Sequence, residues 1–420
     1  MNNRLRELLN ELRPGDNALV NRVEEIVESH RARVTAHRRE FSAPAEEEFP
    51  VNHRDVILLA RTDTFREEQE RPLQYLYRFL EELCDDVFSG VHFPAADDAF
   101  AGVYLSTDDE AIRFREDMET LGSEFLLSRA FNIPGVDGGK LPEALNSILE
   151  SLALGTQCVL LEEPGDSRLV PLLREVLFDL DPGTLLMPDQ MEYTDALPVL
   201  LKERLEQGDP KPMRTWYESQ AESVPIFTVR TGTIGTLTDP NLPAPQRART
   251  YLSGQAVLLA TASLPGVDIH SLVASEAPGV LHYDDLRNEL RDRDSLRSIV
   301  FEGYLDLLRA RTGEIAFDPR GGRSLVESDP RVLALRRWSP ASESSADAGN
   351  DRADDSSVVL CLHNLSSDHV SFRDRRDRYP WPEEGVVREL ISEDLLFPTA
   401  EGELFSLDLQ PWEVMWLRFT

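Results

Sequence analysis

The sequence predicts an α/β barrel followed by a small antiparallel β domain. Fully apolar runs alternate with amphipathic helical patterns over roughly 250 residues, which favours a parallel barrel. A Ser/Asp/Ala-rich break follows at residues 340–357, and beyond it short apolar runs are separated by turn residues. We therefore expect N-terminal amphipathic helices at 1–49, a barrel at 50–325, and a β domain at 326–420 with a disordered loop near 340–357.

The composition excludes several classes of protein. The chain has 420 residues, 41% of them hydrophobic, with 44 Lys and Arg against 76 Asp and Glu, a formal charge of -32. Nucleic-acid binding needs a basic surface, so this balance argues against it and suits a strongly solvated surface. The three cysteines lack metal or disulfide spacing, and neither a signal peptide nor a membrane span is evident. We expect a cytoplasmic protein with no membrane partner.

The N-terminal segment predicts two helices broken at Pro14-Gly15, because its apolar residues follow helical spacing. The expected buried faces are Leu5, Leu8, Leu9 and Leu12, then Leu19, Val23, Ile26 and Val27. Further strands are predicted at 56–60, 88–93, 125–132, 158–161, 185–187, 224–229, 257–262 and 264–267. Helices are predicted between them at 73–83, 108–121, 143–154, 169–177 and 196–206, and a charged helical region at 283–310.

Residues 155–190 indicate a strand, a helix and a second strand, each strand ending in polar residues. Glu162 and Glu163 end the first strand, and Asp189 follows the second. Ligands and chemistry gather at the carboxyl ends of parallel strands, so two carboxylates there could form an acid/base pair. The alternative interpretation is that these strands simply end in polar loops.

Other chemical groups of the sequence are expected to be structural. His53, His92, His270 and His282 lack metal-ligand spacing, and the Gly-rich segment 135–139 lacks the lysine of a phosphate-binding loop. We therefore predict no metal and no cofactor. Packing is expected for the aromatic residues, with the last three in the core of the β domain: Tyr251, Tyr283, Trp216, Phe405, Trp412 and Trp416.

Several motifs together resemble glycoside hydrolase family 13, the α-amylase family, and within it the sucrose and glucosylglycerate phosphorylase branch. The matching stretches occur in the family's order, at residues 89–93, 97–100, 264–272, 294–304, 316–319 and 409–417. The resemblance covers most of residues 50–420. It implies a (β/α)8 TIM barrel and a retaining mechanism with a carboxylate nucleophile and a second carboxyl as acid/base.

This sequence departs from the family's catalytic pattern. In the Arg-x-Asp motif after the fourth strand, Leu160 replaces the Arg and Glu162 stands in place of the nucleophilic Asp. Asp189 aligns with the acid/base Glu. The family's His-Asp pair aligns with the stretch that contains Thr231-Gly232 and Ile234-Gly235, and neither a His nor an Asp occurs there.

The resemblance also implies losses around the third strand. Asn132-Ile133 replaces an Asn-His pair, and the short chain that follows predicts a degenerate barrel without a full B domain. Asp98 and His270 are the expected sugar-binding remnants.

These departures predict a non-catalytic relative that acts in carbohydrate metabolism as a partner, regulatory or sugar-sensing protein. It would bind a carbohydrate, and it would assemble with a second copy or with an active paralogue. The alternative is an active retaining glycoside phosphorylase or glycosidase that uses Glu162 and Asp189. A third hypothesis is an assembly protein whose acidic surface and N-terminal helices mediate oligomerisation.

Overall fold

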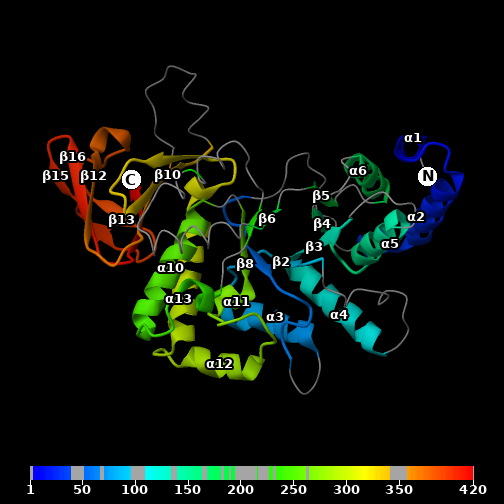
Figure 1. The fold of residues 1–420 in the computed structure, drawn as a ribbon, viewed down its shortest axis with the longest axis horizontal. Helices are drawn as coiled ribbons and strands as arrows, with labels where there is room; N and C mark the ends of the chain where they lie inside the picture. Colours follow the sequence, from blue (N-terminus) through cyan, green and yellow to red (C-terminus); the bar gives the residue numbers. More distant parts are fainter. Residues whose placement is uncertain are drawn as a thin grey trace. The chain divides into compact units, whose positions relative to one another are not determined.

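The computed structural model describes residues 3–38, 52–66, 71–95, 109–133, 140–162, 168–180, 184–188, 191–193, 215, 227–229, 233–261, 264–340 and 357–419. The chain forms two compact units (Figure 1). The first comprises Met1–Pro50, Ile57–Met191 and Val280–Tyr283, and the second comprises Val51–Val56, Glu192–Gly279 and Asp284–Thr420. The predicted helix at 196–206, Trp216 and the predicted disordered loop, apart from residues 340 and 357, lie outside the described residues.

The first unit is built on five parallel strands in the order β5-β4-β3-β2-β1. They are β1 (Ile57–Leu59), β2 (Gly90–Phe93), β3 (Leu126–Asn132), β4 (Cys158–Glu162) and β5 (Leu185–Pro188). Helices α3 (Pro72–Leu83), α4 (Asp109–Glu124), α5 (Lys140–Ala153) and α6 (Leu169–Leu180) connect them. Every residue of β1 and β2 is buried, and for β1 this is what the fully apolar run at 56–60 predicts.

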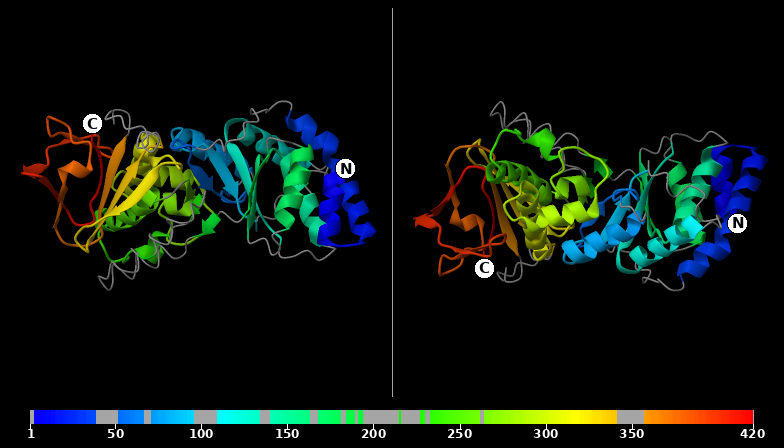
Figure 2. Two further views of the ribbon diagram at one scale, coloured as in Figure 1. Left: turned by 90° about the horizontal axis from the view of Figure 1, so that it is seen from above. Right: turned by 90° about the horizontal axis from the view of Figure 1, so that it is seen from below.

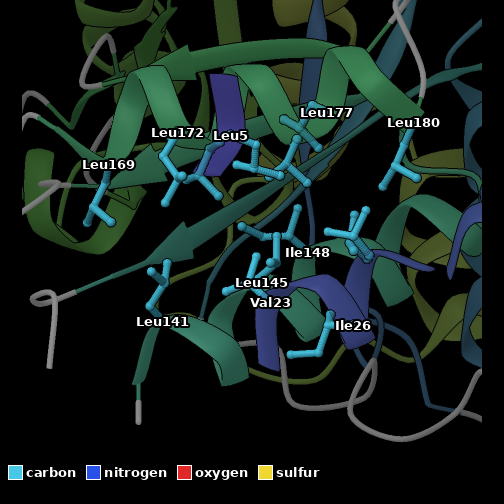
Figure 3. Packing of buried hydrophobic residues seen from close by; sticks show 14 of the residues in the cluster. Leu5, Val23, Ile26, Leu141, Leu145, Ile148, Leu169, Leu172, Leu177 and Leu180 are labelled. Atoms are coloured by element: carbon cyan, nitrogen blue, oxygen red, sulfur yellow. The ribbon is translucent and has the colours of Figure 1, made fainter. Parts of the chain in front are cut away.

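The two N-terminal helices, α1 (Asn3–Leu12) and α2 (Asn17–Arg38), complete this unit. Gly15 between them has φ of +79°, and the Asp16 carboxylate accepts from Leu19 N at 3.0 Å, which caps the second helix. All eight predicted apolar residues are buried. They pack against the leucines of α5 and α6 (Figure 3). Phe131, Val159 and Leu161 of the sheet belong to the same cluster. The apolar faces of both N-terminal helices are therefore buried within this chain.

The strand–helix–strand pattern predicted at 155–190 is confirmed as β4, α6 and β5. Only residues 133–139 separate β3 from α5, seven positions in which no inserted domain can fold. This short connection agrees with the predicted loss of the B domain.

The barrel part of the second unit contains the parallel strands β7 (Phe227–Val229) and β8 (Leu264–Asp268). Its helices are α9 (Ile234–Leu237), α10 (Ala244–Thr261), α11 (Ile269–Leu272), α12 (Tyr283–Arg291) and α13 (Leu296–Thr312). A short strand, β6 (Met191–Tyr193), has its first residue in the first unit and the other two in the second. The predicted strand at 257–262 is wrong, because 257–261 are the last residues of α10. This end of α10 is buried all round, so its apolar run lacks the helical period.

Two antiparallel sheets form the C-terminal part of the second unit (Figure 2). A six-stranded sheet has the order β14-β13-β17-β11-β10-β9, and a three-stranded sheet has the order β12-β16-β15. The strands are β9 (Gly322–Val326), β10 (Val332–Trp338), β11 (Val358–Asn364), β12 (Val370–Arg375), β13 (Val387–Glu389), β14 (Leu395–Leu396), β15 (Thr399–Glu401), β16 (Leu404–Leu409) and β17 (Val414–Phe419). A buried aromatic and aliphatic core, which includes Phe372, Phe405 and Phe419, joins them.

Three arginines fix the carboxyl end of α10, directly before β8. Arg311 Nε donates to Leu259 O at 3.1 Å, Arg337 Nη1 to Ala260 O at 2.8 Å, and Arg323 Nη1 to Thr261 O at 2.8 Å. The last carbonyls of a helix have no partner within it, and cations are favoured at this end of its dipole. Arg311 and Arg337 are buried. These bonds therefore fix the position of α10 relative to the C-terminal sheet.

Candidate functional site

The first candidate site is the carboxyl edge of the parallel sheet in the first unit. Because the strands are parallel, their carboxyl ends lie at one edge, where α/β proteins bind ligands. Asn132 ends β3 and is the register partner of Glu162, which ends β4. Leu161 pairs with Pro188, the last residue of β5. The sheet therefore places the backbone of Glu162 at the edge where the sequence predicts a carboxylate.

Two layers of buried side chains lie before this edge. Ala130 and Leu160 are register partners two residues before the strand ends, and both are buried. Leu160 is the residue in the position of the family's Arg. Leu160 gives this position a buried aliphatic side chain. The position therefore provides no positive charge beside a carboxylate at residue 162.

His92 and Ser128 form the next layer and are also register partners. The Nδ1 atom of His92 and the Ser128 hydroxyl share a hydrogen bond of 2.8 Å. Burial lowers the pKa of His92 to about 3, so the ring is neutral at physiological pH. Ser128 lies four residues before the end of β3, whereas His92 is the second-last residue of β2. His92 is buried and bonded to Ser128, so it is a packed residue of the sheet, as the sequence predicts.

Of the predicted site residues in the first unit, the structure describes only part. Asp98 and Asp189 lie outside the described residues. For Glu162 the backbone is described as the end of β4. The pairing of Glu162 with Asp189 stays a prediction.

His270 follows β8 in the second unit and is half-buried on α11. The Asp268 carboxylate at the end of β8 accepts from His270 N at 2.8 Å and from Ser271 N at 3.3 Å, which caps this short helix. The His270 Nδ1 atom lies 3.4 Å from the Ser275 hydroxyl. Burial lowers the pKa of His270, Asp268 opposes this shift and Arg297 adds to it. The ring is thus held in place as a neutral group.

An ion pair that the sequence does not reveal holds the segment after β7. Arg247 donates to both carboxylate oxygens of Glu276 at 2.6 and 2.7 Å, and its Nε donates to Thr238 Oγ1 at 2.8 Å. The bond to Arg247 lowers the pKa of Glu276. The two residues lie 29 positions apart, so no local spacing predicts the pair.

This arrangement leaves no space for a larger residue at Gly235. A Cβ atom there would lie 2.4 Å from Glu276 O. Ile234 beside it is buried, and Thr231 and Gly232 lie outside the described residues. The position that aligns with part of the family's His-Asp pair therefore cannot hold an acidic side chain in this backbone arrangement.

The structure confirms the predicted packing for some of the aromatic residues and corrects the prediction for one of them. Tyr251 is buried and donates to Ser271 O at 3.1 Å, and Tyr283 is buried against Phe65, so packing is confirmed for both. Trp416 is also buried, with its ring 4.9 Å from that of Phe317. Trp412 is not a core residue, which corrects the prediction: it is half-buried and lines a groove.

Within the described ranges, no three His, Cys, Asp or Glu side chains lie close enough together to hold a metal ion. Among the helices of the described part of the chain, none is long and apolar enough to cross a membrane.

Solved structures define the class of fold. A maltogenic α-amylase from Thermotoga neapolitana matches 88% of this chain and 99% of its own, with a TM-score of 0.59 and 12% identity. An α-amylase from Anoxybacillus matches 87% of this chain and 98% of its own, with a TM-score of 0.57 and 10% identity. The fold is the one found in these α-amylases, a (β/α) barrel with a C-terminal antiparallel β domain, as the motifs predict.

The sequence comparison places the resemblance within that class. The chain is 35% identical over 261 residues to a glucosylglycerate phosphorylase from Spirochaeta thermophila. The match covers 56% of this chain and 39% of that protein, so the chain spans about two fifths of the relative's length. The predicted resemblance to the phosphorylase branch is confirmed. No family model matches the sequence.

Proposed function

We propose that this chain binds an α-glucoside at the carboxyl edge of its parallel sheet and cleaves it by phosphorolysis or hydrolysis. The observation that carries the proposal is the position of Glu162, which ends β4 in register with the end of β3. The 35% identity to a glucosylglycerate phosphorylase supports a glycoside as the ligand. The buried free thiols Cys84, Cys158 and Cys361 support the cytoplasm as its compartment.

In this proposal Glu162 and Asp189 divide the retaining reaction between them. The Glu162 carboxylate attacks the anomeric carbon, while Asp189 gives a proton to the leaving oxygen, which yields a covalent glycosyl-enzyme. Asp189 then takes a proton from phosphate or water, whose oxygen attacks the same carbon and releases Glu162. Phosphate as acceptor gives a sugar 1-phosphate and water gives the free sugar.

A second candidate is a sugar-binding relative without turnover, which acts as a partner or sensor beside an active paralogue. Two observations favour it. Leu160 is buried in the position of the family's Arg, and the contact at Gly235 excludes the acidic residue that helps to hold the sugar in the family. Loss of single members of a catalytic unit costs orders of magnitude in rate.

One experiment separates the two candidates. Purified protein is incubated with sucrose or glucosylglycerate, with and without phosphate, and glucose 1-phosphate and glucose are measured. The first candidate requires turnover that falls by roughly a thousandfold or more in Glu162→Gln and in Asp189→Asn, while the adjacent carboxylate variant Glu163→Gln retains activity. The second candidate would remain if calorimetry shows binding of the same glycosides while neither the wild type nor any of the three variants turns them over.

A further inference from the structure

A groove in the second unit lies outside the sheet edge considered above. It has a volume of about 420 Å³ and runs between α10, α13 and the turn that joins β16 to β17. This volume falls within the usual range of small-molecule sites. The groove is lined by both apolar and polar side chains, with Leu252 and Ile391 among the former and Arg249, Asp306 and Glu413 among the latter.

A buried hydroxyl in the lining has no hydrogen-bond partner among the residues that the structure describes. Ser253 on α10 is 1% exposed, and its Oγ makes no hydrogen bond within the described residues. A buried hydroxyl without a partner costs about 1–3 kcal/mol. Since Ser253 lines the groove, a ligand there is placed to satisfy it.

A second lining residue of the groove, Trp412, has a strained backbone. Trp412 has φ of +60°, a region that costs an ordinary residue about 1–2 kcal/mol. Its backbone N donates to Ser366 O at 3.1 Å, which fixes the turn. Residues held at such strained backbone angles cluster at functional sites. The Trp412 residue is one of those that line the groove.

The chemistry of the lining selects the ligand. Asp306 and Glu413 disfavour an anion, Arg249 disfavours a cation, and the buried Ser253 hydroxyl disfavours a wholly apolar molecule. A neutral molecule with many hydroxyls can donate to the carboxylates, accept from the guanidinium and lay its CH face on an indole ring. We propose that this groove is a saccharide-binding site, separate from the sheet edge and independent of the function proposed there.

The proposal is tested on the full chain labelled with 5-fluorotryptophan, with maltotriose as the probe. The ¹⁹F resonance of Trp412 is assigned by its loss in Trp412→Phe. We expect maltotriose to shift that resonance in a saturable manner, and calorimetry to give a matching affinity. Ser253→Ala should weaken binding several-fold, since the bound saccharide loses a hydrogen-bond partner.

Trp412→Gly separates binding from folding. Glycine accepts a positive φ without strain, so the variant should fold while its affinity for maltotriose falls by about tenfold or more, the loss of a stacking platform. Phe397→Ala removes an aromatic side chain that is 74% exposed and lies outside the groove lining, and should bind as the wild type does. Glu162→Gln should also leave this binding intact.

Three results would overturn the proposal: no shift of the Trp412 resonance at tens of millimolar maltotriose, equal affinity in Trp412→Gly and wild type, or loss of all binding in Glu162→Gln. The last result would move the saccharide to the sheet edge. Catalytic inactivity of the wild type has no bearing on the test, because the readout is binding alone.

Discussion

At the scale of single residues, the structure gives side chains of the same type different environments, which the sequence alone does not distinguish. His92 is buried in the sheet and neutral, His270 is half-buried beside Asp268, and His282 is exposed. Similarly, Trp416 is in the core whereas Trp412 lines a groove. The sequence predicted only that the histidines are packed or surface residues, with His270 also a sugar-binding remnant, and that both tryptophans belong to the core, because a linear pattern does not show what a turn presents.

The buried His92 predicts a pH dependence of stability. Its pKa of about 3 in the folded chain lies below the ordinary value of about 6.5, so the unfolded chain takes up the proton first as pH falls. This contribution is complete above pH 6.5 and is lost as pH falls toward 3. At pH 5 the loss is about 2 kcal/mol, at about 1.4 kcal/mol per pH unit.

Urea unfolding of wild type and His92→Gln at pH 7 and pH 5 measures this share. The variant should lose less stability than the wild type between the two pH values, although it is less stable at pH 7. His282→Gln, an exposed control, should keep the full pH dependence. Equal pH dependence in wild type and His92→Gln would show that the ring titrates freely in the folded chain.

At the scale of elements, the ends of helices decide how the second unit is joined. The last three carbonyls of α10 are each bound by an arginine from α13, β9 or β10. No helix-stop residue precedes β8 in the sequence, so local signals suggested a strand where the helix continues. The helix can stay apolar to its end because its polar carbonyls are satisfied by distant residues.

Arg337→Met should therefore destabilise the chain by about 3 kcal/mol, since Ala260 O and Asp318 O lose buried charged donors. Arg336→Met on the same strand is the control: its guanidinium bonds Arg378 O at the surface, so its loss should cost under about 1 kcal/mol. The free energy of unfolding from denaturant titration gives both values. Equal losses in the two variants would contradict the role of Arg337.

The N-terminal helices make a second prediction at this scale. Leu9 is fully buried in the cluster formed with α5 and α6. Leu9→Ala should cost about 2–5 kcal/mol, as expected of a buried leucine. The exposed Phe178 of α6, 65% accessible, is the control, and Phe178→Ala should change stability by less than about 1 kcal/mol. Thermal unfolding that leaves the two variants alike would mean that α1 does not contribute to this core.

At the scale of the whole molecule, charge is the dominant property. A formal charge of -32 over 420 residues repels itself in the folded state. Raising the salt concentration screens this repulsion, with a Debye length of about 10 Å at 0.1 M and about 3 Å at 1 M. We expect the Tm to rise steadily from 0.05 to 1 M KCl.

NaCl and KCl should act alike if screening is the cause, and differential scanning calorimetry of the wild type in both salts checks this. A Tm that is flat or falls with salt would show that surface ion pairs, such as Arg31 with Asp179 at 2.7 Å, outweigh the net repulsion.

The sequence by itself determined the alternation of strands and helices, the two N-terminal helices and the α-amylase type of fold. These depend on local periodicity and on motif order, which a linear chain carries directly. Only the tertiary structure decided that α10 continues to Thr261, that Gly235 is closed against Glu276, and that Trp412 and Ser253 line one groove. Each of these rests on contacts between distant residues, whose pairing no spacing along the chain encodes.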